Sequence, residues 1–203
     1  MSEANTFPSS SGGDIFYHGS AQAGITHLEP RSKLHNSDKM VVYLTNSMLY
    51  ALFYLWDERH TGCAEKHVTG WTQKGIAYYM EQFPDQLEAF YCGASGYLYT
   101  FSAPADVRRM EKRDGIFYSE KSVEVAQALY IPDVYHALLR EETAGTLRVL
   151  RYREQSPQRQ EELTDLIADM IASNNFFCDD DTRAAFMKRF FTRAWNRAEE
   201  RRA

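Results

Sequence analysis

The sequence contains no apolar run of the length that a membrane-spanning helix needs, and nothing at its start resembles a signal peptide. Cysteine is scarce. Cys63, Cys92 and Cys178 are far apart and odd in number, a pattern that favours reduced thiols over a disulfide framework. We therefore expect a cytoplasmic protein with no membrane partner. The small polar residues of 1–13 predict a disordered leader.

The chain also lacks an excess of positive charge. It has 23 Lys and Arg against 28 Asp and Glu, which gives a net charge of −5, and no basic block stands out. This balance argues against a broad nucleic-acid-binding surface, although a local groove could still be basic.

A convincing set of metal ligands is missing as well. His60, Cys63 and His67 in "HTGCAEKH" are possible zinc ligands. A structural zinc site needs four ligands with tighter paired spacing, and no fourth ligand is near in the sequence. We therefore expect no metal site.

Apolar and aromatic residues, in contrast, are abundant. They make up 44% and 14% of the 203 residues, enough for a folded domain with a substantial core. Strand patterns occur in residues 15–18, 40–45, 96–102, 115–119 and 122–131, and less clearly in 66–71 and 75–80. Asn46 or Ser47 can cap a helix that carries "MLYALFYLWDER", and Pro84 can open a short helix that ends at Gly93.

Helical patterns dominate after residue 131. A helix is expected from Pro132, while residues 146–152 fit a strand or a helix. Ser156 and Pro157 form a good cap and first turn for a long helix, and a last helix is expected from about Asp180. We predict an α+β fold, with a core over residues 14–130 and a helical C-terminal extension over residues 131–203 packed on that core.

The strand at residues 15–18 ends in a distinctive way, with His18, Gly19 and Ser20. A glycine there lets the backbone approach a ligand closely, and the histidine could donate to a sugar hydroxyl. Tyr43 lies near the end of the next clear strand, and Tyr54 follows eleven residues later. Two aromatic planes at these positions could enclose a flat heterocycle. They could equally be core residues, because the chain has thirteen tyrosines.

These motifs resemble those of the ADP-ribosyltransferases of the diphtheria-toxin and poly(ADP-ribose) polymerase type, in which a histidine, a tyrosine and a glutamate mark the site. The matching residues are Tyr17-His18-Gly19-Ser20, then Val42-Tyr43-Leu44-Thr45, then Ala51 and Tyr54. The bacterial rifampicin ADP-ribosyltransferases are similar at both strands and at "GYLYTFSAP". The resemblance covers roughly residues 14–125.

The resemblance implies a split pair of antiparallel sheets that bind NAD as a co-substrate. His18 would hold the adenosine-side ribose, and Gly19 the nicotinamide carboxamide. Tyr43 and Tyr54 would sandwich the nicotinamide ring, with Ser20 and Thr45 beside them. His18, Tyr43 and a carboxylate would form the catalytic set.

Glu120 is the expected carboxylate, and Glu124, Glu81 and Asp106 are alternatives. The predicted activity is NAD-dependent mono-ADP-ribosyl transfer, or a related NAD-consuming reaction, to an acceptor that is a protein, a nucleic acid or a small molecule. The alternative is a non-catalytic protein of the same fold that binds a nucleotide or a protein partner. A third interpretation is an unrelated α+β domain that matches by chance.

Overall fold

The computed structural model describes residues 15–34, 37–111, 113–174, 176–177 and 182–202. The expected leader at 1–13 and Cys178 lie outside these residues. The described chain contains helices together with largely antiparallel sheets, so the predicted α+β class is confirmed. No helix in this part of the chain is long and apolar enough to cross a membrane.

The larger sheet contains the two strands that carry the histidine and tyrosine motifs. Its strand order is β11-β7-β1-β4-β9-β8, with β3 paired to β4. These strands are β1 (Ile15–Ser20), β3 (Ser32–Lys33), β4 (Met40–Thr45), β7 (Gly96–Ser102), β8 (Arg108–Arg109), β9 (Ile116–Ser119) and β11 (Gln127–Ile131). All pairings within it are antiparallel.

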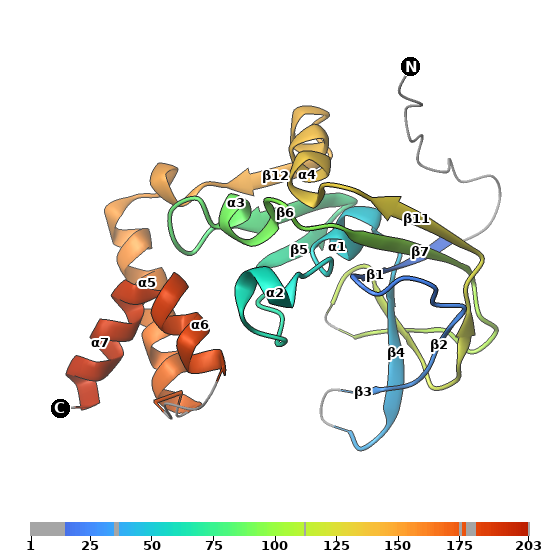
Figure 1. Ribbon diagram of the computed structural model, residues 1–203, viewed down its shortest axis with the longest axis horizontal. Helices are drawn as coiled ribbons and strands as arrows, with labels where there is room; N and C mark the ends of the chain where they lie inside the picture. The colour runs from blue at the N-terminus through green and yellow to red at the C-terminus, as the bar shows by residue number, and fades with distance from the viewer. Residues whose placement is uncertain (1–14, 35–36, 112, 175, 178–181, 203) are drawn as a thin grey trace.

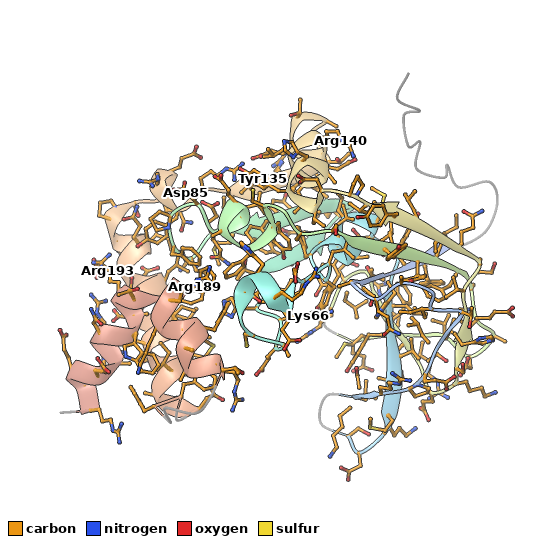
Figure 2. All side chains as sticks on the ribbon, in the orientation of Figure 1. Lys66, Asp85, Tyr135, Arg140, Arg189 and Arg193 are labelled. Atoms are coloured by element: carbon orange, nitrogen blue, oxygen red, sulfur yellow. The ribbon has the colours of Figure 1, made fainter. Side chains whose placement is uncertain are left out.

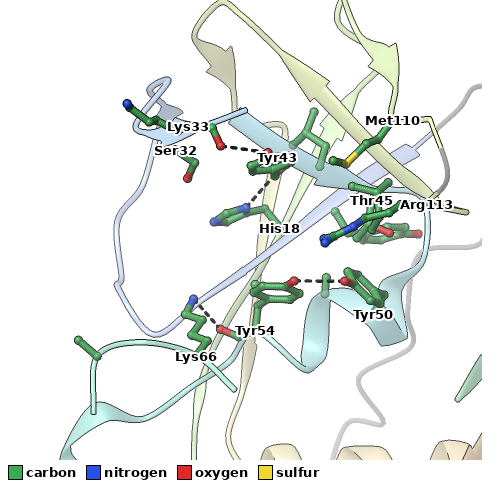
Figure 3. A pocket seen from close by; sticks show the side chains of 16 residues that line it. His18, Ser32, Lys33, Tyr43, Thr45, Tyr50, Tyr54, Lys66, Met110 and Arg113 are labelled. Carbon is green, nitrogen blue, oxygen red and sulfur yellow. Dashed lines mark hydrogen bonds between the residues drawn. The ribbon is translucent and has the colours of Figure 1, made fainter. Parts of the chain in front are cut away.

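The sheet opens between its two central strands. β1 pairs with β7 along its whole length, whereas β1 and β4 share only the Tyr17–Thr45 pair. Beyond this pair the two strands diverge, and side chains occupy the space between them. His18 follows Tyr17 directly on β1, and Tyr43 lies two residues before Thr45 on β4 (Figure 3).

A second sheet joins segments that are distant in sequence. Its strands are β5 (Gly70–Gln73), β6 (Ile76–Met80) and β12 (Leu147–Leu150), in the order β12-β6-β5. β12 pairs with β6 in parallel, so a strand beyond residue 130 completes a sheet that begins at residue 70. A small pair of strands, β2 (His27–Leu28) and β10 (Val123–Glu124), lies apart from both sheets.

Two of the helices begin at the predicted caps, but the helix expected after Ser47 and the last helix expected from about Asp180 are each divided in two. Ser47 and Ser156 each accept a backbone hydrogen bond as N-caps. The single helix expected after Ser47 is instead α1 (Met48–Leu52) and α2 (Glu58–Thr61), which begins at its own cap, Asp57. The remaining helices are α3 (Gln86–Tyr91), α4 (Val134–Thr143), the 3-10 turn η1 (Tyr152–Glu154), α5 (Pro157–Ser173), α6 (Thr182–Phe190) and α7 (Thr192–Arg202).

Two apolar clusters hold this arrangement together. The larger one joins α1, α3 and α4 to the C-terminal helices through buried residues such as Trp56, Phe90 and Phe186. The smaller one covers the other face of the larger sheet and contains Phe16 and Leu44. Figure 1 shows α5, α6 and α7 grouped at one end of the molecule, with β1, β4 and β7 toward the other end.

The C-terminal helices also carry charge pairs on their outer side. Arg193, Arg197 and Arg201 recur every four residues along α7 and face carboxylates of α5. Arg197 lies 3.0 Å from Asp165, and Arg193 is visible at the helical end of the molecule (Figure 2). Because these pairs are largely exposed, the buried seam beneath them contributes most of the stability of this contact.

Candidate functional site

A cavity of about 570 Å³ lies where β1 and β4 diverge, with α1 beneath it (Figure 3). Its volume is in the range of small-molecule sites. Five of the residues predicted to bind a ligand line it together: His18, Gly19, Tyr43, Thr45 and Tyr54. Ser20 is not among the lining residues; its hydroxyl accepts a hydrogen bond from the backbone N–H of Gln22 at 3.1 Å.

The imidazole of His18 is fixed by the neighbouring strand. Its Nδ1 lies 3.2 Å from the carbonyl oxygen of Tyr43. A carbonyl can only accept, so Nδ1 carries the proton and donates it. Burial lowers the pKa of His18, partly opposed by the Tyr43 carbonyl and reinforced by the charge of Lys66. The neutral ring then presents Nε2 as an acceptor. His18 would therefore accept a hydrogen bond from a sugar hydroxyl, and not donate one as the sequence suggested.

Tyr43 and Thr45 of β4 are each held by a hydrogen bond of the side-chain hydroxyl. The Tyr43 hydroxyl donates to the carbonyl of Lys33 on β3 at 3.1 Å, which fixes the ring at the cavity wall. The hydroxyl of Thr45 accepts the backbone N–H of Ser47 at 3.0 Å and so sets the turn into α1. Both contacts restrict the rotamers of groups that a ligand would touch.

Tyr54 lies in the turn directly after α1, and not on the helix as expected. Its backbone N–H reaches back to Ala51 at 3.1 Å, an i to i−3 bond that tightens the helix end. Its hydroxyl is 3.2 Å from that of Tyr50, and the two ring centroids are 5.4 Å apart. Burial, followed by the neighbouring Tyr50, raises the pKa of Tyr54, so the phenol stays neutral.

Gly19 permits the close approach of β1 to α1. A Cβ at this position would lie 2.1 Å from the backbone carbonyl oxygen of Ala51. Any side chain would therefore push the helix away from the strand. This contact alone requires glycine, and it sets the spacing between the wall that carries His18 and the wall that carries Tyr54.

The formal charges around the cavity are all positive. Lys33, Lys66 and Arg113 are among the lining residues, and none of the described residues that line the cavity is an aspartate or a glutamate. The Nζ of Lys66 donates to the carbonyl of Tyr54 at 3.1 Å. The Lys66 side chain stays accessible, but protein atoms surround its ammonium group closely enough to lower its pKa. The cavity thus favours an anionic ligand.

The four carboxylates considered from the sequence lie elsewhere. Glu120 is at the end of β9, where it pairs with Lys39 at 2.7 Å and Arg108 at 3.4 Å. Lys39 lowers the pKa of Glu120, chiefly through its hydrogen bond. Glu124 is exposed on β10, and Asp106 accepts from the Ser119 hydroxyl. Glu81 is buried at 1% exposure and accepts backbone N–H groups from Leu87 and Tyr152.

The three residues weighed as zinc ligands make separate contacts. The Nε2 of His60 donates a hydrogen bond to the carbonyl oxygen of Ala89 at 2.7 Å. His67 is 2.7 Å from the side-chain oxygen of Gln82, and Cys63 is buried. Within the described residues no group of three or more His, Cys, Asp or Glu is placed to hold a metal ion.

Sequence reasoning did not identify Tyr50, Lys66 or Arg113 as cavity residues. The position of Tyr50, four residues before Tyr54, was a usable signal, because residues four apart share a helix face. Lys66 and Arg113 lie in loops, where no periodicity marks a side chain that turns toward a ligand. Only the folded chain brings them to the cavity.

No protein-family model, curated protein or solved structure matches this chain.

Proposed function

We propose that this cavity binds NAD, with the nicotinamide ring between Tyr43 and Tyr54, and that the protein uses NAD as a donor for mono-ADP-ribosyl transfer or a related NAD-consuming reaction. The observation that carries the proposal is the convergence of His18, Gly19, Tyr43 and Tyr54 on one cavity from β1, β4 and the turn after α1. Those are the residues on which the resemblance to ADP-ribosyltransferases depends.

The character of the cavity supports a dinucleotide. Aromatic faces suit the flat nicotinamide ring, and the cations suit a diphosphate. The Nε2 of His18 is available to accept from a ribose hydroxyl. The chain would hold the ring and the ribose in one orientation, and this ordering assists cleavage of the bond between them.

Transfer also needs negative charge near the ribose, because positive charge develops there as nicotinamide leaves. Glu120 remains the proposed source. It directly follows β9, four residues beyond Ile116, which lines the cavity. Four extended residues span about 13 Å, so Glu120 would have to move toward the cavity to act on a bound ribose.

The second candidate function is a protein that binds NAD or another nucleotide without cleaving it. The observation that favours it is the lack of any carboxylate among the described residues that line the cavity. The two functions use the same cavity, and only the first includes cleavage of the bound nucleotide.

Two measurements on the purified protein separate these candidates. Calorimetry should detect NAD binding, and Tyr54→Ala should weaken it by about 1–3 kcal/mol, the size of one lost aromatic stack with its buried area. Tyr130→Ala, an exposed tyrosine on β11, is the matched control and should bind NAD normally. Absence of binding at millimolar NAD would refute the enzyme, and would leave the second candidate only with a nucleotide other than NAD.

Release of free nicotinamide is the second measurement. Release by the parent protein that is lost in Tyr54→Ala supports the enzyme. Binding without release, across protein, nucleic-acid and small-molecule acceptors, supports the binding protein.

A further inference from the structure

Lys66 lines the cavity and is held there by a backbone carbonyl instead of a carboxylate. It lies in the loop after α2 and extends toward the cavity between α2 and the larger sheet (Figures 2 and 3). Its Nζ donates to the carbonyl of Tyr54 at 3.1 Å and lies 5.5 Å from the centre of the Tyr54 ring. The ammonium is thus held at the edge of the proposed nicotinamide slot.

Among the residues that the structure describes, no acidic partner neutralises this ammonium. Lys33 pairs with Asp38 at 3.2 Å and Lys39 pairs with Glu120 at 2.7 Å, but within the described residues no carboxylate lies within ion-pair distance of Lys66. An ammonium group has three N–H donors, and the Tyr54 carbonyl accepts one of them. Two donors therefore remain for an anion.

His18 and Lys66 lie on the same side of the cavity. The charge of Lys66 acts on the imidazole strongly enough to contribute to its lowered pKa. Arg113, the other lining cation without a carboxylate partner in the described chain, lies on the opposite side of the two tyrosines (Figure 3). A ligand that leaves the tyrosine slot past His18 meets Lys66, and not Arg113.

We propose that Nζ of Lys66 binds the diphosphate of the dinucleotide at the point where it leaves the slot between Tyr43 and Tyr54. This inference rests on the proposed function and adds a diphosphate subsite to it. The ammonium replaces hydrating water on the diphosphate with a charge-assisted hydrogen bond, and the Tyr54 carbonyl orients it for this contact.

The proposal distinguishes a ligand with a diphosphate from one without it. Lys66→Gln removes the charge and keeps much of the length, whereas Lys66→Arg keeps the charge. We expect Lys66→Gln to weaken NAD binding by roughly 10-fold to 100-fold, which is the range for a lost charge-assisted hydrogen bond. Binding of nicotinamide alone, which carries no diphosphate, should stay within about two-fold, and Lys66→Arg should retain most of the NAD affinity.

The experiment is calorimetry with NAD and ligand-observed NMR with nicotinamide and inorganic diphosphate, on the full chain. Inorganic diphosphate should bind the parent and compete with NAD, and Lys66→Gln should abolish both effects. Lys121→Gln, an exposed lysine outside the cavity, is the matched control and should behave as the parent.

The possible results separate the diphosphate subsite from the proposed function. Equal losses of NAD and nicotinamide binding in Lys66→Gln would show that Lys66 only positions Tyr54, and unchanged NAD binding would remove the subsite altogether. If the parent binds no NAD but binds diphosphate through Lys66, the proposed function fails while the anion site stands. If the parent binds NAD and Lys66→Gln binds it equally well, the subsite fails while the proposed function stands.

Discussion

Replacing Gly19 with alanine tests how closely β1 and α1 must approach. The added Cβ would lie 2.1 Å from the carbonyl oxygen of Ala51 and 3.1 Å from its carbonyl carbon. Both atoms belong to the backbone, so no rotation of a side chain relieves the contact. The strand and the helix must separate by about 1 Å to restore an ordinary van der Waals distance.

The expected loss in the free energy of unfolding comes from the packing of α1, which this separation disturbs. α1 buries Leu49, Ala51 and Leu52 in the larger apolar cluster, and Leu55 just beyond it is wholly buried. Overpacking of this kind typically costs about 1–3 kcal/mol. For a chain of this size each kcal/mol lowers the melting temperature by about 2–4 °C, so a decrease of roughly 2–12 °C is expected.

Urea unfolding at 25 °C, followed by tryptophan fluorescence, measures this change in the free energy of unfolding. Ser20→Ala is the control, because it changes the neighbouring residue of the same strand and affects only a hydrogen bond at the surface. It should cost less than about 0.5 kcal/mol. If Gly19→Ala unfolds at the same urea concentration as Ser20→Ala, the contact between β1 and Ala51 does not constrain the cavity.

Three further outcomes follow from the same structure. Glu81→Ala should destabilise the fold by about 3–5 kcal/mol in urea unfolding, because it leaves two buried backbone N–H groups without their acceptor and removes one of the two carboxylates that pair with Arg151; a loss below 1 kcal/mol would contradict that role. Burial lowers the pKa of both His18 and His67 below 6.5, so the unfolded chain takes up more protons as the pH falls, and stability should decrease from about pH 7 downward until the folded pKa values are passed. NMR titration checks both values, and a pKa above 6.5 for either ring would reverse the sign. Glu120→Gln should leave NAD affinity within a few-fold in calorimetry, because Glu120 lies outside the cavity; if nicotinamide release is lost while binding is kept, the carboxylate does reach the ribose during the reaction.

Local chemistry explains which parts of the fold the sequence predicted well. The strands at residues 15–18 and 40–45 and the caps at Ser47 and Ser156 are present, because the strand preference of β-branched and aromatic residues and the capping of helices are local effects. The helix after Ser47 breaks for a reason that is not local. Phe53, Leu55 and Trp56 are all buried in one cluster. A continuous helix would turn some of these side chains toward solvent.

Long-range pairing explains much of what the sequence did not predict. Residues 122–131 look like one strand, yet Val123 and Glu124 pair with β2 while Gln127–Ile131 pairs with β7. Nothing in the pattern of these residues indicates where one partner replaces the other. The candidate site likewise combines residues that local motifs indicate with residues that only the fold brings near. The motif residues of β1 and β4 line one cavity, whereas Lys66 and Arg113 reach that cavity through loops.

The parallel pairing of β6 with β12 has a consequence for synthesis of the chain. β6 is complete at Met80, but its partner begins only at Leu147. At translation rates of ~5–20 residues per second, the outer edge of β6 waits roughly 3–13 s for its partner. An unpaired edge of this kind can add a strand from another copy, so chains halted before Leu147 should be prone to aggregate. β12 therefore protects the edge of β6 only late in synthesis. A chain released before Leu147 would keep this edge exposed.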